Sequence, residues 1–372
     1  MTTNESPTQV TDTDVDVADP ILSIRNTSVT FDMERGASRV LDGVDMDIER
    51  KEILGIVGES GSGKSMFASA LLDAVVDPGV IDGSITYHPT PEESVDILGL
   101  STRELKKYRW AEISMVFQGA MSSFNPTMNM RGHFEETIDA HNENYEEGMA
   151  RARELLSDLY LDPDRVLDAH PHELSGGMKQ RALIALSMVL QPKVLVMDEP
   201  TAALDLLMQR SILQLLHEIK EKYEITLIFI THDLPLVAEL ADRLAVMYAF
   251  EFIEVAPAEE ILQNASHPYT RSLLNATPNM STPIEEMRPI SGSAPDPVDV
   301  PEGCSYHPRC PLATEQCREV DPDYHSVRHD HEAKCFHWEQ AADAIPFTLP
   351  QQPGDSHSDA DSDAGAGTGV NN

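Results

Sequence analysis

The sequence predicts an α/β fold with a parallel core sheet. Short apolar runs of strand type, such as 53–57, 113–117 and 194–197, each lead into glycine or polar residues. Ligands gather at the edge of a parallel sheet where the carboxyl ends of its strands lie. Helical patterns lie between these runs, as parallel crossovers require. A charged, helix-rich block at about 127–190 predicts a helical subdomain beside the sheet.

Charge narrows the possible functions. Lys and Arg total 27 and Asp and Glu total 63, so the formal net charge is −36 over 372 residues. Such an acidic excess argues against a nucleic-acid partner, because phosphate contacts need clustered cations. The acidic residues are spread along the chain, which favours a solubility adaptation to concentrated salt. A halophilic source is therefore our hypothesis.

The two ends of the chain lack the pattern of a folded core. Residues 1–20 are polar and acidic, without the features of a secretory signal. In the C-terminal tail, 341–372, Gly, Ser, Asp and Ala dominate from residue 351 to the end. Both segments are predicted to be disordered. No window approaches the ~18 apolar residues of a membrane span. We expect a cytoplasmic protein that reaches a membrane only through a partner.

Local patterns also predict the elements around the core. Residues 21–25, 28–31 and 44–48 are of strand type, and 83–87 with 95–98 predict a small antiparallel addition. A charged helix is expected at 102–108.

The most informative stretch is a phosphate-binding loop. It fits G-x-x-x-x-G-K-[ST] and lies between the strand at 53–57 and a helix at 66–72. Glycines let successive N–H groups face phosphate oxygens at a helix N-terminus. Lys64 would reach the β- and γ-phosphates of a nucleoside triphosphate, and Ser65 would hold Mg²⁺. The predicted nucleotide-binding residues are Gly58, Glu59, Ser60, Gly61, Ser62, Gly63, Lys64 and Ser65.

A second motif is more restrictive. Leu174-Ser175-Gly176-Gly177 followed by Met-Lys-Gln-Arg resembles the signature of ATP-binding cassette ATPases. The resemblance implies a P-loop nucleotide-binding cassette at 21–265 that binds ATP. It also implies that Ser175, Gly176 and Gly177 face the γ-phosphate held by a second cassette, in a homo- or heterodimer, because a serine hydroxyl and backbone N–H groups at a helix N-terminus attract anions.

The same resemblance assigns the remaining site residues in their order along the chain. Asp198 would join Ser65 and Gln118 around Mg²⁺, and Glu199 would polarise the attacking water. His232 matches the histidine that contacts the γ-phosphate, and Asp205 the loop at the dimer interface. Gln118, Glu199 and His232 form the predicted catalytic set. Ala249-Phe250-Glu251 departs from the family's turn, which we interpret as altering a hairpin and not this set.

The region after the cassette indicates the class of substrate that is transported. His267-Pro268-Tyr269-Thr270-Arg271 closely resembles the start of the C-terminal extension of dipeptide and oligopeptide importer ATPases, predicted at 266–340. The resemblance implies an ATPase at the cytoplasmic face of the membrane that drives import through separate permease subunits, with an extracytoplasmic solute-binding protein. Nickel or another small solute is the alternative substrate, and a soluble cassette ATPase outside transport is a more distant one.

All four cysteines lie in this extension, with the spacing C-x5-C-x6-C-x17-C. A disulfide framework is not expected in a cytoplasmic protein, so the cluster predicts a metal site. Four thiolates suit a [4Fe-4S] cluster or Zn²⁺, although zinc usually takes tighter pairs. The family resemblance favours the iron-sulfur cluster. The predicted ligands are Cys304, Cys310, Cys317 and Cys335.

Overall fold

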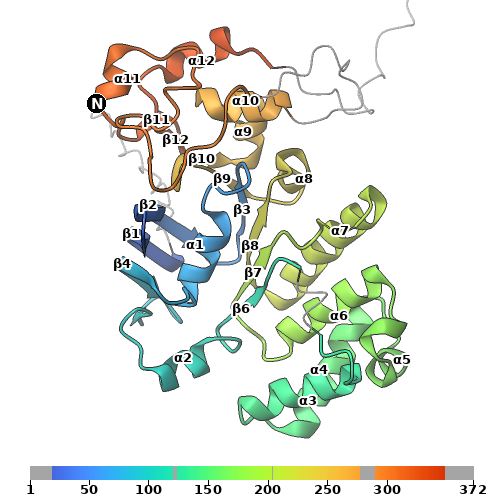
Figure 1. The fold of residues 1–372 in the computed structure, drawn as a ribbon. Coiled ribbons are helices and arrows are strands. Elements are labelled where there is room, and N and C mark those ends of the chain that lie inside the picture. Colours follow the sequence, from blue (N-terminus) through green and yellow to red (C-terminus); the bar gives the residue numbers. More distant parts are fainter. Residues whose placement is uncertain (1–18, 120–123, 203, 277–289, 348–372) are drawn as a thin grey trace, which may run out of the picture.

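The computed structural model describes residues 19–119, 124–202, 204–276 and 290–347 (Figure 1). The predicted disordered N-terminus lies outside these ranges up to residue 18, and the predicted tail lies outside them from residue 348. In the described part of the chain, no helix is long and apolar enough to cross a membrane.

An eight-stranded sheet forms the centre of the molecule, in the order β11-β12-β10-β9-β3-β8-β7-β6. Its middle is parallel, since β9, β3, β8, β7 and β6 run in one direction. β3, β7 and β8 are buried along their whole length, as expected of strands covered on both faces. The parallel strands are β3 (Ile53–Val57), β6 (Ile113–Val116), β7 (Val194–Asp198), β8 (Thr226–Thr231) and β9 (Arg243–Tyr248).

A smaller antiparallel sheet has the order β2-β1-β4-β5. The two strands predicted at 21–25 and 28–31 are one long strand with register shifts. Helix α1 packs between the sheets, because Phe67 of α1 shares a buried cluster with Ile24 of β1 and Ile56 of β3. The strands are β1 (Pro20–Met33), β2 (Gly36–Glu49), β4 (Gly79–Tyr87) and β5 (Val95–Asp96), and the helix is α1 (Lys64–Leu71).

The helical block lies to one side of the large sheet (Figure 1). Its amphipathic helices bury Phe134, Leu155 and Leu156 in a core that continues into the sheet. The helices are α3 (Met130–Ala140), α4 (Tyr145–Asp158), α5 (Pro163–Asp168) and α6 (Gly176–Met188). Those on the rest of the cassette are α2 (Thr102–Tyr108), α7 (Leu206–Tyr223), α8 (Leu234–Ala238) and α9 (Ala258–Asn264).

The chain beyond α9 continues the large sheet and does not stand apart from it. β12 pairs antiparallel with β10, and β11 pairs with β12. Helix α12 extends past residue 341, where the sequence predicts a disordered tail, and Arg271 Nε donates to Ile345 O at 2.6 Å. The elements here are β10 (Glu251–Pro257), α10 (Pro268–Ala276), α11 (Glu315–Glu319), β11 (His325–Arg328), β12 (His331–Ala333) and α12 (Trp338–Ala344).

Candidate active site

The phosphate loop joins β3 to α1 and is closely packed on its inner side. A Cβ at Gly63, whose φ is 110°, would lie 2.8 Å from Val40 O, so only glycine fits there. Lys64 is buried, and its Nζ donates to Gly58 O and Glu59 O, both at 2.8 Å. Burial lowers the pKa of Lys64, although nearby carboxylates oppose this. The ammonium therefore lies inside the curl of the loop, where a phosphate would take the place of its carbonyl partners.

Asp198 ends β7 beside this loop. Its side chain is buried, and no group in the described structure donates to Oδ1. Burial raises the pKa of Asp198, while a hydrogen bond from the Ser65 side chain lowers it. A buried carboxylate oxygen without a partner, next to a serine hydroxyl, is a donor set that suits Mg²⁺. The residues therefore fit the predicted ion.

Three predicted catalytic residues meet at the neighbouring carboxylate. Gln118 Nε2 donates to Glu199 Oε2 at 3.0 Å, and His232 Nδ1 lies 3.2 Å from Glu199 Oε1. Glu199 has a left-handed backbone with φ of 46°, and its N–H donates to Ile230 O at 2.9 Å. Both oxygens of the Glu199 carboxylate are thus oriented by side chains that follow β6 and β8, the two strands that flank β7.

The signature residues lie elsewhere in the chain. Ser175 is the N-cap of α6, with its Oγ accepting from Met178 N at 3.3 Å. A Cβ at Gly176 would meet no atom within 4 Å, so this backbone is open to an approaching ligand. Figure 1 shows α6 well separated from α1. One chain therefore does not bring its own signature to its own phosphate loop.

Asp205 also has a local role. Its carboxylate caps α7, with Oδ1 accepting from Met208 N at 3.0 Å. Capping explains an aspartate at this position without reference to a dimer. The interface role of Asp205 stays a prediction.

The sequence did not indicate which segments support the phosphate loop. Phe250 N–H in the altered turn donates to Ser62 O at 3.0 Å, and Ala249 and Phe250 both have positive φ. Glu59 forms an ion pair with Arg309, and its N–H donates to Tyr269 Oη at 2.9 Å. The phosphate-binding role of Glu59 itself stays a prediction. The motif at 267–274 was visible in the sequence, but its contact with the loop was not.

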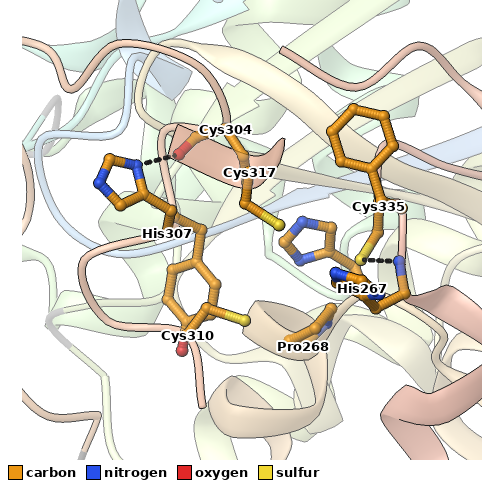
Figure 2. A pocket seen from close by; sticks show the side chains of 10 residues that line it. His267, Pro268, Cys304, His307, Cys310, Cys317 and Cys335 are labelled. Carbon is orange, nitrogen blue, oxygen red and sulfur yellow. Dashed lines mark hydrogen bonds between the residues drawn. The ribbon is translucent and has the colours of Figure 1, made fainter. Parts of the chain in front are cut away.

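The four cysteines come together from distant positions. They line one pocket with His267, His307 and His337 (Figure 2). All four are free, and burial raises the pKa of Cys304 and Cys335 to about 12 and that of Cys310 to about 11. His337 N–H donates to Cys335 Sγ at 3.3 Å. In the described residues no group of three or more His, Cys, Asp or Glu side chains is arranged to hold a single metal ion.

Comparisons with known proteins agree with this geometry. Residues 41–202 match the family described as ABC transporter. Residues 253–317 match the family described as oligopeptide/dipeptide transporter, C-terminal region. The dimeric ATP-binding cassette MJ0796, bound to ADP and Pi, superposes with a TM-score of 0.55 at 26% identity, covering 64% of this chain and 98% of that one.

Curated relatives resemble nearly the whole chain. The dipeptide transport ATP-binding protein DppD of Caldanaerobacter subterraneus is 40% identical, over 84% of this chain and 95% of the relative. DppD of Escherichia coli is 37% identical over 85% and 96%, and the oligopeptide transport ATP-binding protein OppD of the same species is 38% identical over 82% and 90%. The chain therefore belongs to the ATP-binding subunits of the dipeptide and oligopeptide ABC transporters, and it is an ATPase of the cassette type.

Proposed function

We propose that this chain hydrolyses ATP to energise the import of dipeptides or oligopeptides through a separate membrane permease. The observation that carries the proposal is the pairing of a complete catalytic carboxylate site with the peptide-transporter C-terminal region at residues 253–317. The partners are a second cassette, permease subunits and an extracytoplasmic solute-binding protein. The chain would act at the cytoplasmic face of the membrane.

The residues divide the chemistry between them. The N–H groups of the phosphate loop and the Lys64 ammonium would bind the β- and γ-phosphates, and Ser65, Asp198 and Gln118 would hold Mg²⁺. When bound, Mg²⁺ would supply positive charge beside the phosphates. Glu199 accepts the proton of the attacking water, and Gln118 and His232 keep its carboxylate in place.

The second cassette completes each site. Ser175, at the exposed start of α6, would donate to the γ-phosphate bound by the partner, together with the N–H groups of Gly176 and Gly177. This arrangement is supported by the open backbone at Gly176 and by the distance of α6 from α1 in one chain. It makes hydrolysis depend on closure of the dimer.

We propose that the cysteine pocket binds a [4Fe-4S] cluster, with Zn²⁺ as the alternative. Cys304, Cys310, Cys317 and Cys335 line one pocket, and four thiolates suit either group. Zinc usually takes its cysteines in tighter pairs than the spacing C-x5-C-x6-C-x17-C, which favours the cluster. Anaerobically purified protein should absorb broadly at the edge of the visible range. Colourless protein with stoichiometric zinc would identify the alternative.

Uptake in cells tests the transport proposal. Radiolabelled dipeptides and oligopeptides are supplied to cells that lack this gene, carry it, or carry the Glu199→Gln variant. Peptide uptake should be lost on deletion and restored by the wild type alone. Unchanged peptide uptake, with loss of nickel or another solute instead, would refute the substrate assignment while leaving the ATPase in place.

A further inference from the structure

The phosphate loop and the C-terminal region meet at Glu59, the second residue of the loop. Arg309 binds the Glu59 carboxylate with both terminal nitrogens: Nη1 donates to Oε2 at 2.7 Å and Nη2 donates to Oε1 at 3.0 Å. Tyr269 of α10 accepts the Glu59 N–H at 2.9 Å. Both the side chain and the N–H of Glu59 are thus bound by residues outside the family-wide cassette core, which the match to residues 41–202 marks.

Arg309 is itself held firmly. Its side chain is only 6% exposed, and Nε donates to Ser291 O at 2.7 Å. The guanidinium lies 5.7 Å from the ring centre of Tyr248 and 6.0 Å from that of Tyr306. A planar fork fixed on all its nitrogens can hold a carboxylate in one orientation, which a lysine cannot do.

A buried aromatic cluster supports this arginine. The ring centres of Tyr248, Tyr269 and Tyr306 lie 4.5 to 5.5 Å apart, and each residue is almost fully buried. Tyr248 ends β9, Tyr269 belongs to α10, and Tyr306 precedes Arg309 in the Cys304–Cys310 loop. Close packing of three rings from three segments leaves Arg309 little freedom to move.

The segment at 291–297, whose Ser291 carbonyl accepts from Arg309 Nε, also contacts the small antiparallel sheet. Arg39 N–H in β2 donates to Pro297 O at 2.8 Å, and Arg35 forms an ion pair with Asp296 at 3.4 Å. Asp296 and Pro297 therefore contact the β1–β2 hairpin, while Arg309 contacts the phosphate loop. The C-terminal region holds the nucleotide-binding half at two places.

Glu59 connects this support to the reacting phosphates. Its carbonyl oxygen accepts from Lys64 Nζ at 2.8 Å, so the same residue faces Arg309 with its side chain and Lys64 with its backbone. Glu59 is also an anion in a loop that must receive a triphosphate, in a chain with a net charge of −36. An unpaired carboxylate there would repel the ligand.

We propose that Arg309 is a positioning residue for ATP: it neutralises Glu59 and fixes the phosphate loop in its receptive shape, so that the C-terminal region sets nucleotide affinity. This inference rests on the phosphate loop binding ATP, as proposed above. It assigns to the extension a function inside the ATPase site, in addition to holding its cysteine pocket.

The test is a fluorescence titration of the full-length chain, purified anaerobically, with N-methylanthraniloyl-ATP and Mg²⁺. Arg309→Met should weaken binding about tenfold, because it leaves a charged partner unpaired next to the ligand. The Kd of Arg309→Lys should lie between those of the wild type and Arg309→Met. The matched control is Arg328→Met, which breaks the surface ion pair with Glu260 in the same region and should bind as the wild type does.

A double variant separates positioning from simple anchoring. Glu59→Gln combined with Arg309→Met removes the repelling charge and should bind more tightly than Arg309→Met alone. If Arg309 only anchors the extension, Arg309→Met will lower the melting temperature, keep the wild-type Kd, and gain nothing from the second substitution. That result would overturn the inference.

Two further outcomes are distinguishable. A wild-type chain that does not bind the nucleotide would refute the proposed function, and this inference with it. If Arg309→Met does not fold, Arg309→Lys carries the test, and a wild-type Kd for that variant would count against positioning by a bidentate fork.

Discussion

Glu254 joins the cassette to its C-terminal region through a fully buried contact between its carboxylate and the His331 ring. Both Glu254 in β10 and His331 in β12 have 0% exposed side chains, and His331 Nε2 lies 2.8 Å from Glu254 Oε1. The carboxylate also accepts from the N–H groups of Ser266 and His267. Glu254→Ala would leave three buried donors without their acceptor.

The size of the effect follows from these contacts. Each buried donor that loses its partner costs about 1–3 kcal/mol, and breaking a buried pair from one side costs about 3–5 kcal/mol in total. We expect Glu254→Ala to lower the free energy of unfolding by about 3–5 kcal/mol. Urea unfolding followed by circular dichroism measures this change without screening ion pairs.

A surface pair in the same region provides the control. Arg328 of β11 and Glu260 of α9 lie 2.8 Å apart with side chains 52% and 33% exposed. Glu260→Ala should cost less than about 1 kcal/mol, because water replaces the lost contact. If Glu254→Ala costs no more than Glu260→Ala, the reasoning that this buried pair anchors the C-terminal region is wrong.

Three other predictions concern the catalytic carboxylate, pH and salt. Glu199→Gln should reduce ATP turnover in a steady-state assay by about 10²- to 10⁴-fold, while nucleotide binding persists in a titration. Normal turnover would exclude Glu199 as the general base. Burial raises the pKa of Glu52 above 4.5 despite Arg243, so the folded state holds this proton more tightly than the unfolded state. Its contribution to stability is complete below pH 4.5 and is lost as pH rises through the raised pKa. The stability of Glu52→Gln relative to the wild type should therefore increase from about pH 4.5 to pH 7 in urea unfolding, and a decrease would contradict the assignment. Raising KCl from about 0.1 to about 1 M shortens the Debye length from about 10 to about 3 Å. Because this screens a net charge of −36, it should raise the melting temperature. A melting temperature insensitive to KCl would argue against the halophilic hypothesis.

The proximity of the three predicted catalytic residues could be expected because each follows a strand that is visible in the sequence. Gln118, Glu199 and His232 come directly after or near the ends of β6, β7 and β8, which lie side by side in the sheet. Parallel strands place their carboxyl ends at one edge, so residues at these positions meet. Local spacing thus predicts a long-range constellation in this part of the chain.

The C-terminal region was less predictable. β11 and β12 have four and three residues, too few to show a period of two. The place of β12 beside β10 depends on pairing between Glu254 and Ala333, far apart in the sequence, and β11 follows as the partner of β12. Helix α12 crosses the predicted boundary between the extension and the tail at residue 341. Arg271 of α10 holds it by donating to Ala342 O and Ile345 O, contacts that no local pattern indicates.

The glycine spacing and lysine after an apolar strand predicted a bound nucleoside triphosphate, because the loop makes those contacts within a few residues of the motif. The resemblance carried by residues 174–181 implied an ATPase. The tertiary structure alone revealed the pairing of Glu59 with Arg309, 250 residues apart. A single ion pair between distant residues produces no repeated spacing in the sequence. Each partner looks like an ordinary charged residue until folding brings the two together. Motifs therefore predict the chemistry of the site, whereas folding determines which distant segments hold it in shape.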